Sequence, residues 1–178
     1  MGSEMCIRDR VYRNIFQKNS SETISSIDQD VDENIWLGTR DGLFLVQNYK
    51  YSDPIEILQD DQFSFGRVSN INCVDDNIVW VTTLGDGAFC IKNNKIIELS
   101  EYVEPSSKLM NTSMIINDSI ICLATNNGID VYQFNWERDL QIKFLRNINN
   151  FDGLASNYVN DIEYWNCLLY TSPSPRDS

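Results

Sequence analysis

Oxygen-bearing side chains at regular spacing are the first groups in this sequence that could bind a metal ion. Four of them occupy alternate positions, as the leading ligands of a calcium-binding loop do: Asp28, Asp30, Asp32 and Asn34. Such a loop also needs glycine at its sixth position and glutamate at its twelfth. This sequence has Glu33 and Thr39 there, so we expect a solvated hairpin turn and no metal or cofactor.

Catalytic chemistry has few candidates in the chain. Neighbouring carboxylates such as Asp60 and Asp61 could act as the acid and base of a glycosidase, but 26 Asp and Glu residues make adjacent pairs inevitable. The sequence contains no histidine, which excludes Ser-His-Asp and Cys-His catalysis and every histidine metal site. An enzyme is the least favoured function class, and we expect no catalysis in this segment.

Charge and cysteine content narrow the function classes further. The 178 residues include 26 acidic and 14 basic ones, a net charge of -12, which argues against nucleic-acid binding because that function needs a basic stripe. Three cysteines lie in apolar, strand-like runs: Cys73, Cys90 and Cys122. We expect buried free thiols there, because an odd count without a Cys-x-x-Cys spacing supports neither a disulfide framework nor a zinc site.

The two ends of the chain differ in composition from everything between them. With one choice of codons for residues 2–10, the reverse complement translates in a shifted frame as residues 167–174. Opposite strands of one element at both ends are typical of a ligated library adapter, and this DNA resembles a transposase-type sequencing adapter. We therefore expect residues 1–10 and 167–178 to be adapter-derived. Residues 11–166 are then an interior piece of a longer reading frame, and localisation cannot be read from its ends.

Similar segments recur along the rest of the chain. One apolar position is in register in each segment, 44 and then 42 residues apart: Trp36, Trp80 and Cys122. A threonine follows three residues later, and then a short polar turn that ends in glycine: Thr39 with Gly42, Thr83 with Gly87, and Thr125 with Gly128. A fourth unit opens near Val159, and its aromatic position would fall at residue 171.

Each unit has the pattern of four short strands. The first strand alternates apolar and polar residues and ends in an Asp/Asn cluster, and an Asn/Asp-Gly turn follows the second strand. The expected fourth strands are residues 55–59, 95–99 and 141–148.

Repeats of this length indicate β-propeller blades, and an all-β sandwich is the alternative. We expect an incomplete propeller of about three and a half blades with units starting near 24, 68, 110 and 159. In it, Trp36 fills the gap between sheets, Gly38 permits close backbone approach and Gly42 forms the turn.

The first repeat, "SIDQDVDENIWLGTRDGLFLV", closely resembles the two-component regulator propeller repeat. That repeat has the form I-x-x-I-x-x-D-x-x-G-x-(I/L)-W-(I/L)-G-T-x-x-G-L, and the "DGLASNYVNDI" segment of the last unit is similar to the lead-in of a blade in that family. Three departures occur: Glu33 replaces the turn glycine, the second unit lacks the equivalent of Gly38, and Cys122 replaces the tryptophan of the third unit.

The resemblance implies a function that composition alone does not. Most proteins with these repeats are bacterial sensor histidine kinases whose extracytoplasmic, periplasmic part carries propellers and a β-sandwich before the membrane, and many respond to oligosaccharides. It implies a ligand-sensing propeller, completed by further blades of the parent chain and homodimeric in that parent. The alternative is a structural or interaction propeller of a secretion or surface assembly, because the repeats also occur in type IX secretion components.

A ligand is expected at one end of the sheets. In a propeller, the turns between second and third strands share a face with the segments that lead into each first strand, while the Asp/Asn turns lie opposite. Planar amide, carboxylate and guanidinium groups suit sugar hydroxyls, although tight turns also favour Asn, Asp and Gly. The candidate ligand-binding residues are Arg40, Asp41, Arg67, Asp86, Asn126, Asn127, Asp152 and Asn157.

Overall fold

The computed structural model is all-β and describes residues 23–47, 55–56, 66–74, 78–93, 95–136, 139–165 and 168–173. The first sheet contains β1 (Ile24–Gln29), β2 (Ile35–Thr39), β3 (Leu43–Val46) and β4 (Ile55–Glu56). The second contains β5 (Val68–Val74), β6 (Ile78–Thr83), β7 (Ala88–Lys92) and β8 (Lys95–Glu98). The third contains β9 (Met110–Ile116), β10 (Ile120–Thr125), β11 (Gly128–Trp136) and β12 (Leu140–Ile148). A two-stranded sheet, β13 (Val159–Trp165) and β14 (Leu168–Pro173), follows them.

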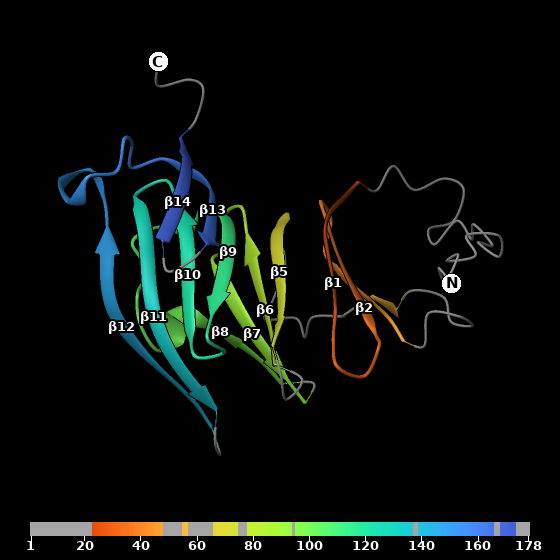
Figure 1. The fold of residues 1–178 in the computed structure, drawn as a ribbon. Helices are drawn as coiled ribbons and strands as arrows, with labels where there is room; N and C mark the ends of the chain where they lie inside the picture. The colour runs from red at the N-terminus through yellow and green to blue at the C-terminus, as the bar shows by residue number, and fades with distance from the viewer. Residues whose placement is uncertain are drawn as a thin grey trace, which may run out of the picture.

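The sheets stand one after another with their first strands adjacent (Figure 1). All pairings are antiparallel between strands that follow each other in the chain. This arrangement confirms the expected incomplete β-propeller. Among the described residues, short 3-10 turns lie between β8 and β9, η3 (Leu99–Glu101), and between β12 and β13, η4 (Asn150–Asp152). None of the described residues forms a helix that is long and apolar enough to cross a bilayer.

The core lies between neighbouring sheets. Trp36 of the first sheet packs in one cluster with Val68 and Ile71 of the second. A Cβ atom at Gly38 would stand 2.4 Å from Val68 Cγ1, so the two sheets can approach this closely only because residue 38 is glycine. Cys122 occupies the equivalent place in the third sheet, in a cluster with Val159 and Ile162 of β13.

Polar contacts join the first strands to one another. The β5 backbone donates hydrogen bonds from Ile71 N to Ser26 Oγ (3.0 Å) and from Cys73 N to Asp28 Oδ2 (2.7 Å). Asn70 Nδ2 in turn donates to Thr112 Oγ1 of β9 at 2.7 Å. Side chains of one sheet therefore satisfy the free strand edge of the next, which would otherwise expose unpaired amides.

The Asp/Asn turn of the first sheet is organised by one carboxylate. Asp30 accepts hydrogen bonds from the backbone N–H groups of Asp32 (3.0 Å) and Asn34 (2.9 Å). Its Oδ2 also accepts from Trp36 Nε1 at 3.0 Å. Residues that resemble calcium ligands in sequence are thus engaged as a hairpin turn, and the described residues contain no group of His, Cys, Asp or Glu suited to a metal ion.

Three sequence expectations are not tested by the structure or fall outside it. β14 (Leu168–Pro173) lies within residues 167–178, which we expect to be adapter-derived, so its pairing with β13 does not test the aromatic position expected at residue 171. The fourth strand of the first sheet, expected over 55–59, is described only for Ile55–Glu56. The carboxylates Asp60 and Asp61 lie outside the described residues.

An exposed flank predicts that residues 11–166 do not form an independently stable monomer. Ile24 and Ile27 are 44% and 63% exposed, whereas their equivalents in the second sheet, Val68 and Ile71, are 0% and 3% exposed because the first sheet covers them. We expect a recombinant 11–166 segment to self-associate or to unfold without a sharp transition, as followed by ultracentrifugation and thermal melting. A single cooperative melt of a monomer would contradict this prediction.

Glu33 predicts a stabilising substitution, because it has a left-handed backbone, φ 62°, at the position where the resembling family has glycine. An L side chain in that region costs about 1 kcal/mol, which glycine avoids. We expect Glu33→Gly to raise the free energy of unfolding of the complete propeller by up to about 1 kcal/mol. Glu33→Ala is the matched control because it removes the carboxylate and keeps the Cβ atom. Equal effects of both changes in denaturant titrations would refute the conformational explanation.

The buried cysteines predict slow thiol chemistry in the folded protein. Burial raises the pKa of Cys122 to about 11 and that of Cys90 to about 12, from an ordinary 9.0. Because the folded values are raised, each thiol contributes stability that is complete below pH 9.0 and is lost as the pH rises through the folded value. We expect iodoacetamide at mildly alkaline pH to label both residues only after denaturation, as read site by site by mass spectrometry. Labelling of Cys90 in the native protein at the denatured rate would contradict this expectation.

Candidate ligand-binding face

The turns between second and third strands have one common internal structure. In each, a fully buried threonine hydroxyl donates to the carbonyl of the turn glycine: Thr39 to Gly42 (3.0 Å), Thr83 to Gly87 (3.0 Å) and Thr125 to Gly128 (2.9 Å). The same hydroxyl accepts a backbone N–H from the turn, that of Asp41, Asp86 or Asn127. The repeated threonine thereby fixes the backbone of each turn, and the side chains at the tip are left outside this hydrogen-bond pair.

The fixed turns meet the segments that lead into the next first strands. Gly87 N donates to the carbonyl of Lys108, just before β9, at 3.2 Å. Gly128 N donates to the carbonyl of Asn157, just before β13, at 2.6 Å. Turns and lead-in segments therefore share one end of the sheets, which we call the turn face: residues 40–42, 84–87, 126–128, 66–67, 108–109 and 149–158. The Asp30 turn lies at the other end of β1, because Ile24 pairs with Thr39 while Gln29 pairs with Ile35.

Three of the candidate ligand-binding residues come together around η4. Asn157 Oδ1 accepts from Asn150 N at 2.7 Å, and its carbonyl accepts from Gly128 N beside Asn127. Asp152 Oδ2 accepts from Asn149 N at 3.1 Å. Asn126, exposed, is the other tip residue of the same turn.

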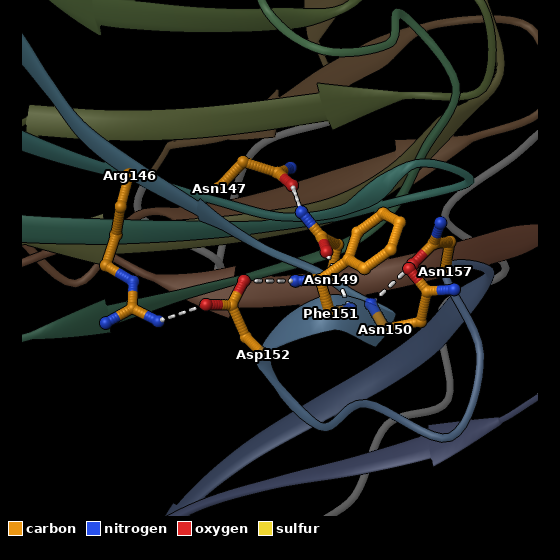
Figure 2. A network of polar contacts seen from close by, with 7 residues as sticks. All are labelled: Arg146, Asn147, Asn149, Asn150, Phe151, Asp152 and Asn157. Carbon is orange, nitrogen blue, oxygen red and sulfur yellow. Dashed lines mark hydrogen bonds and ion pairs between the residues drawn. The ribbon is translucent and has the colours of Figure 1, made fainter.

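Sequence reasoning missed several members of this cluster, which Figure 2 draws with Asp152 and Asn157. Arg146 Nη2 lies 3.5 Å from Asp152 Oδ1. Asn147 Nδ2 donates to the carbonyl of Asn127 at 3.1 Å. The remaining missed residues are Asn149, Asn150 and Phe151, the last of which is 95% exposed. Three asparagines within four residues, Asn147, Asn149 and Asn150, were the sequence signal that could have indicated this loop.

A buried carboxylate holds one member of the cluster, Asn147, by a hydrogen bond. Asp130 is fully buried and accepts hydrogen bonds from Asn147 Nδ2 (2.8 Å) and Ser106 N (2.8 Å). Its position corresponds to Phe44 and Phe89 of the other sheets, so this carboxylate is specific to the third unit. Asp130 thus ties the loop before β9 to the end of β12.

The other candidates lie elsewhere on the turn face. Asp86 Oδ2 accepts from Gly66 N at 2.8 Å, and the neighbouring Arg67 carbonyl accepts from Leu84 N at 2.8 Å. These contacts bring Asp86 and Arg67 together at the second sheet. Arg40 and Asp41 are exposed at the tip of the first turn, and no hydrogen bond between described residues joins them to the other candidates.

A hollow of about 310 Å³ opens at the end opposite the turn face. Its walls combine apolar and polar side chains: Val74, Ile78, Phe134, Trp136, Asp118, Ser119, Gln133 and Asn135. Val74 stands where the first sheet has Asp30. The buried Trp80 Nε1 has no hydrogen-bond partner among the described residues, whereas Trp36 Nε1 donates to Asp30.

Comparison with known proteins gives no family model and no curated protein that matches this chain. Solved structures do match. One is the extracellular domain of BT4673 of B. thetaiotaomicron, described as a hybrid two-component system, with a TM-score of 0.63 and 17% identity over 89% of this chain and 20% of that one. Another is the extracellular domain of BT3049 of the same organism, described in the same way, with a TM-score of 0.62 and 19% identity over 83% of this chain and 20% of that one.

A third structure belongs to a different kind of assembly. PorZ, described as a surface component of the type-IX secretion system of Porphyromonas gingivalis, has a TM-score of 0.52 and 22% identity over 63% of this chain and 17% of that one. This chain spans about a fifth of the length of the two extracellular domains. At these identities the similarity shows the fold, and the chain has the architecture of part of a β-propeller.

Proposed function

We propose that this chain is part of a ligand-sensing β-propeller in the extracytoplasmic region of a membrane-bound two-component sensor histidine kinase. Its ligand is an oligosaccharide or another small molecule, and the segment itself performs no catalysis. Two lines support the proposal: the first repeat resembles the two-component regulator propeller repeat, and two structures of the same fold are extracellular domains described as parts of hybrid two-component systems.

The turn face is the observation that carries the ligand-sensing role. Its turns are held by the buried threonines, so exposed polar side chains stand on a rigid backbone. Binding to fixed groups avoids the entropy of ordering loops at the moment of binding. The remaining blades of the parent chain would extend this face, and a homodimeric parent would carry two copies of it.

A structural or interaction propeller of a secretion or surface assembly is the second candidate, and the similarity to PorZ supports it. The two candidates differ in what the parent gene encodes after this segment. A transmembrane helix and a kinase module in the extended reading frame support the sensor. A secretion or attachment domain, with neither of those, would exclude the sensor and favour the alternative.

The turn face predicts where substitutions weaken ligand binding in the intact sensor. We expect Arg40→Ala and Asn127→Ala each to weaken ligand affinity by about tenfold, because each removes a planar polar group from a rigid site. The matched controls are Asp32→Ala and Asp118→Ala at the opposite end of the sheets, which we expect to change affinity by no more than about twofold. Titration calorimetry measures both. Loss of affinity in the controls with retention in the first pair would place the ligand at the opposite face.

A further inference from the structure

We propose that Phe151 is the stacking platform for a ring of a neutral sugar; this deepens the sensing function proposed above by naming its ligand class. The side chain is 95% exposed, and no described side chain packs against its ring. Large aromatic residues normally bury most of their surface. The folded segment therefore presents an apolar ring that its own packing does not use.

The neighbouring sheets do not cover this position. The η3 turn, between β8 and β9, has the same capping arrangement as η4, with Glu98 and Glu101 in the places of Asn149 and Asp152. Ser100 is then the equivalent of Phe151 in this cap, and it is partly buried with the sheets on both sides of it present. A further blade would therefore leave part of the equivalent position at η4 accessible to a ligand.

The backbone beneath the ring is held in a single arrangement. Phe151 N donates to Asn149 Oδ1 at 2.9 Å, and Asn150 N donates to Asn157 Oδ1 at 2.7 Å. Gly153 closes the turn with φ 104°, and its N–H donates to the carbonyl of Asn150 at 3.2 Å. A ring on such a backbone loses little freedom when a ligand binds.

Polar groups that sugar hydroxyls can use belong to the same network of contacts as Phe151 (Figure 2). The Arg146 guanidinium contacts Asp152 through Nη2 and has further N–H donors. The exposed Asn150 side-chain amide has no hydrogen-bond partner among the described residues. An apolar ring beside planar donors and acceptors matches a pyranose, which has an apolar C–H face and a rim of hydroxyls.

Two features favour a neutral sugar over other occupants. A protein partner usually needs an apolar patch made by several residues, whereas the sequence neighbours of Phe151 are asparagine, aspartate and glycine. The chain has a net charge of -12, which disfavours anionic glycans, and Asp152 already engages Arg146.

The experiment uses the intact sensor ectodomain on an array of neutral, uronic-acid and sulfated oligosaccharides, with calorimetry on the neutral oligosaccharide that binds best. We expect Phe151→Ala to weaken that binding by about tenfold or more, and Phe151→Trp to keep it. Tyr102→Ala is the matched control, because Tyr102 is an exposed aromatic residue beside the equivalent η3 turn; we expect it to change affinity by no more than about twofold. Circular dichroism verifies that each variant is folded.

Different results of these experiments would reject either the Phe151 platform, the neutral ligand class or the oligosaccharide ligand itself. Neutral-sugar binding that survives Phe151→Ala but is lost with Asn127→Ala would reject the platform and leave the sensing function standing. Binding of anionic glycans only would reject the neutral ligand class. A changed monomer–dimer equilibrium of Phe151→Ala in ultracentrifugation, with unchanged sugar affinity, would make the ring a protein contact. Absence of binding to every oligosaccharide would reject the platform together with the oligosaccharide ligand.

Discussion

The close packing of each first strand against the preceding sheet is the contact on which the rest of this structure depends. Val68 lies so near Gly38 that a Cβ atom there would overlap it, and Trp36 fills the space beside them. This contact explains the glycine two places after Trp36 in the first unit. Gly38 meets the requirement fully, and Ala124 meets it in the third sheet, where it packs with Val159 and Ile162. The second sheet has the buried Thr82 there, and its first strand still contacts the third sheet through Asn70 and Thr112.

Each repeat has a part whose residue types are constrained by packing and hydrogen bonds, and a turn tip whose residue types can vary. The buried threonine holds the turn by the same pair of hydrogen bonds in all three complete sheets. Since neither bond involves a tip side chain, the tip can change without loss of turn geometry. The tips have in fact diverged, from Arg40 and Asp41 in the first turn to Asn126 and Asn127 in the third. Constant threonines and variable tips are typical of a scaffold that presents different groups on a fixed frame.

The periodic part of this structure could be predicted from the sequence, and the unique part could not. Repeat spacing predicted the sheets, their strand order and the positions of Trp36 and Gly38, because each blade repeats the same local pattern. The repeat spacing also aligns Asp30 with Val74, but only the structure shows that Trp80 Nε1 has no hydrogen-bond partner among the described residues. The η4 cluster was missed for a similar reason: Asn147 reaches Asp130 and Asn127 across the sheet, and a pattern along the chain does not contain such contacts. Asp152 and Asn157 were singled out for their place before a strand, while their partners in the cluster were not.

The turn face also depends on the assembly of neighbouring sheets. Asp130, in the middle of the third sheet, holds Asn147 on one side and the loop that leads into β9 on the other. Gly128 reaches forward to Asn157, which belongs to the next unit. The geometry of the η4 cluster is therefore set by three segments from two successive blades, and a single blade could not form it. A recognition surface of this kind exists only while the sheets remain packed, so the residues that stabilise the propeller and those that shape its candidate site form one connected network.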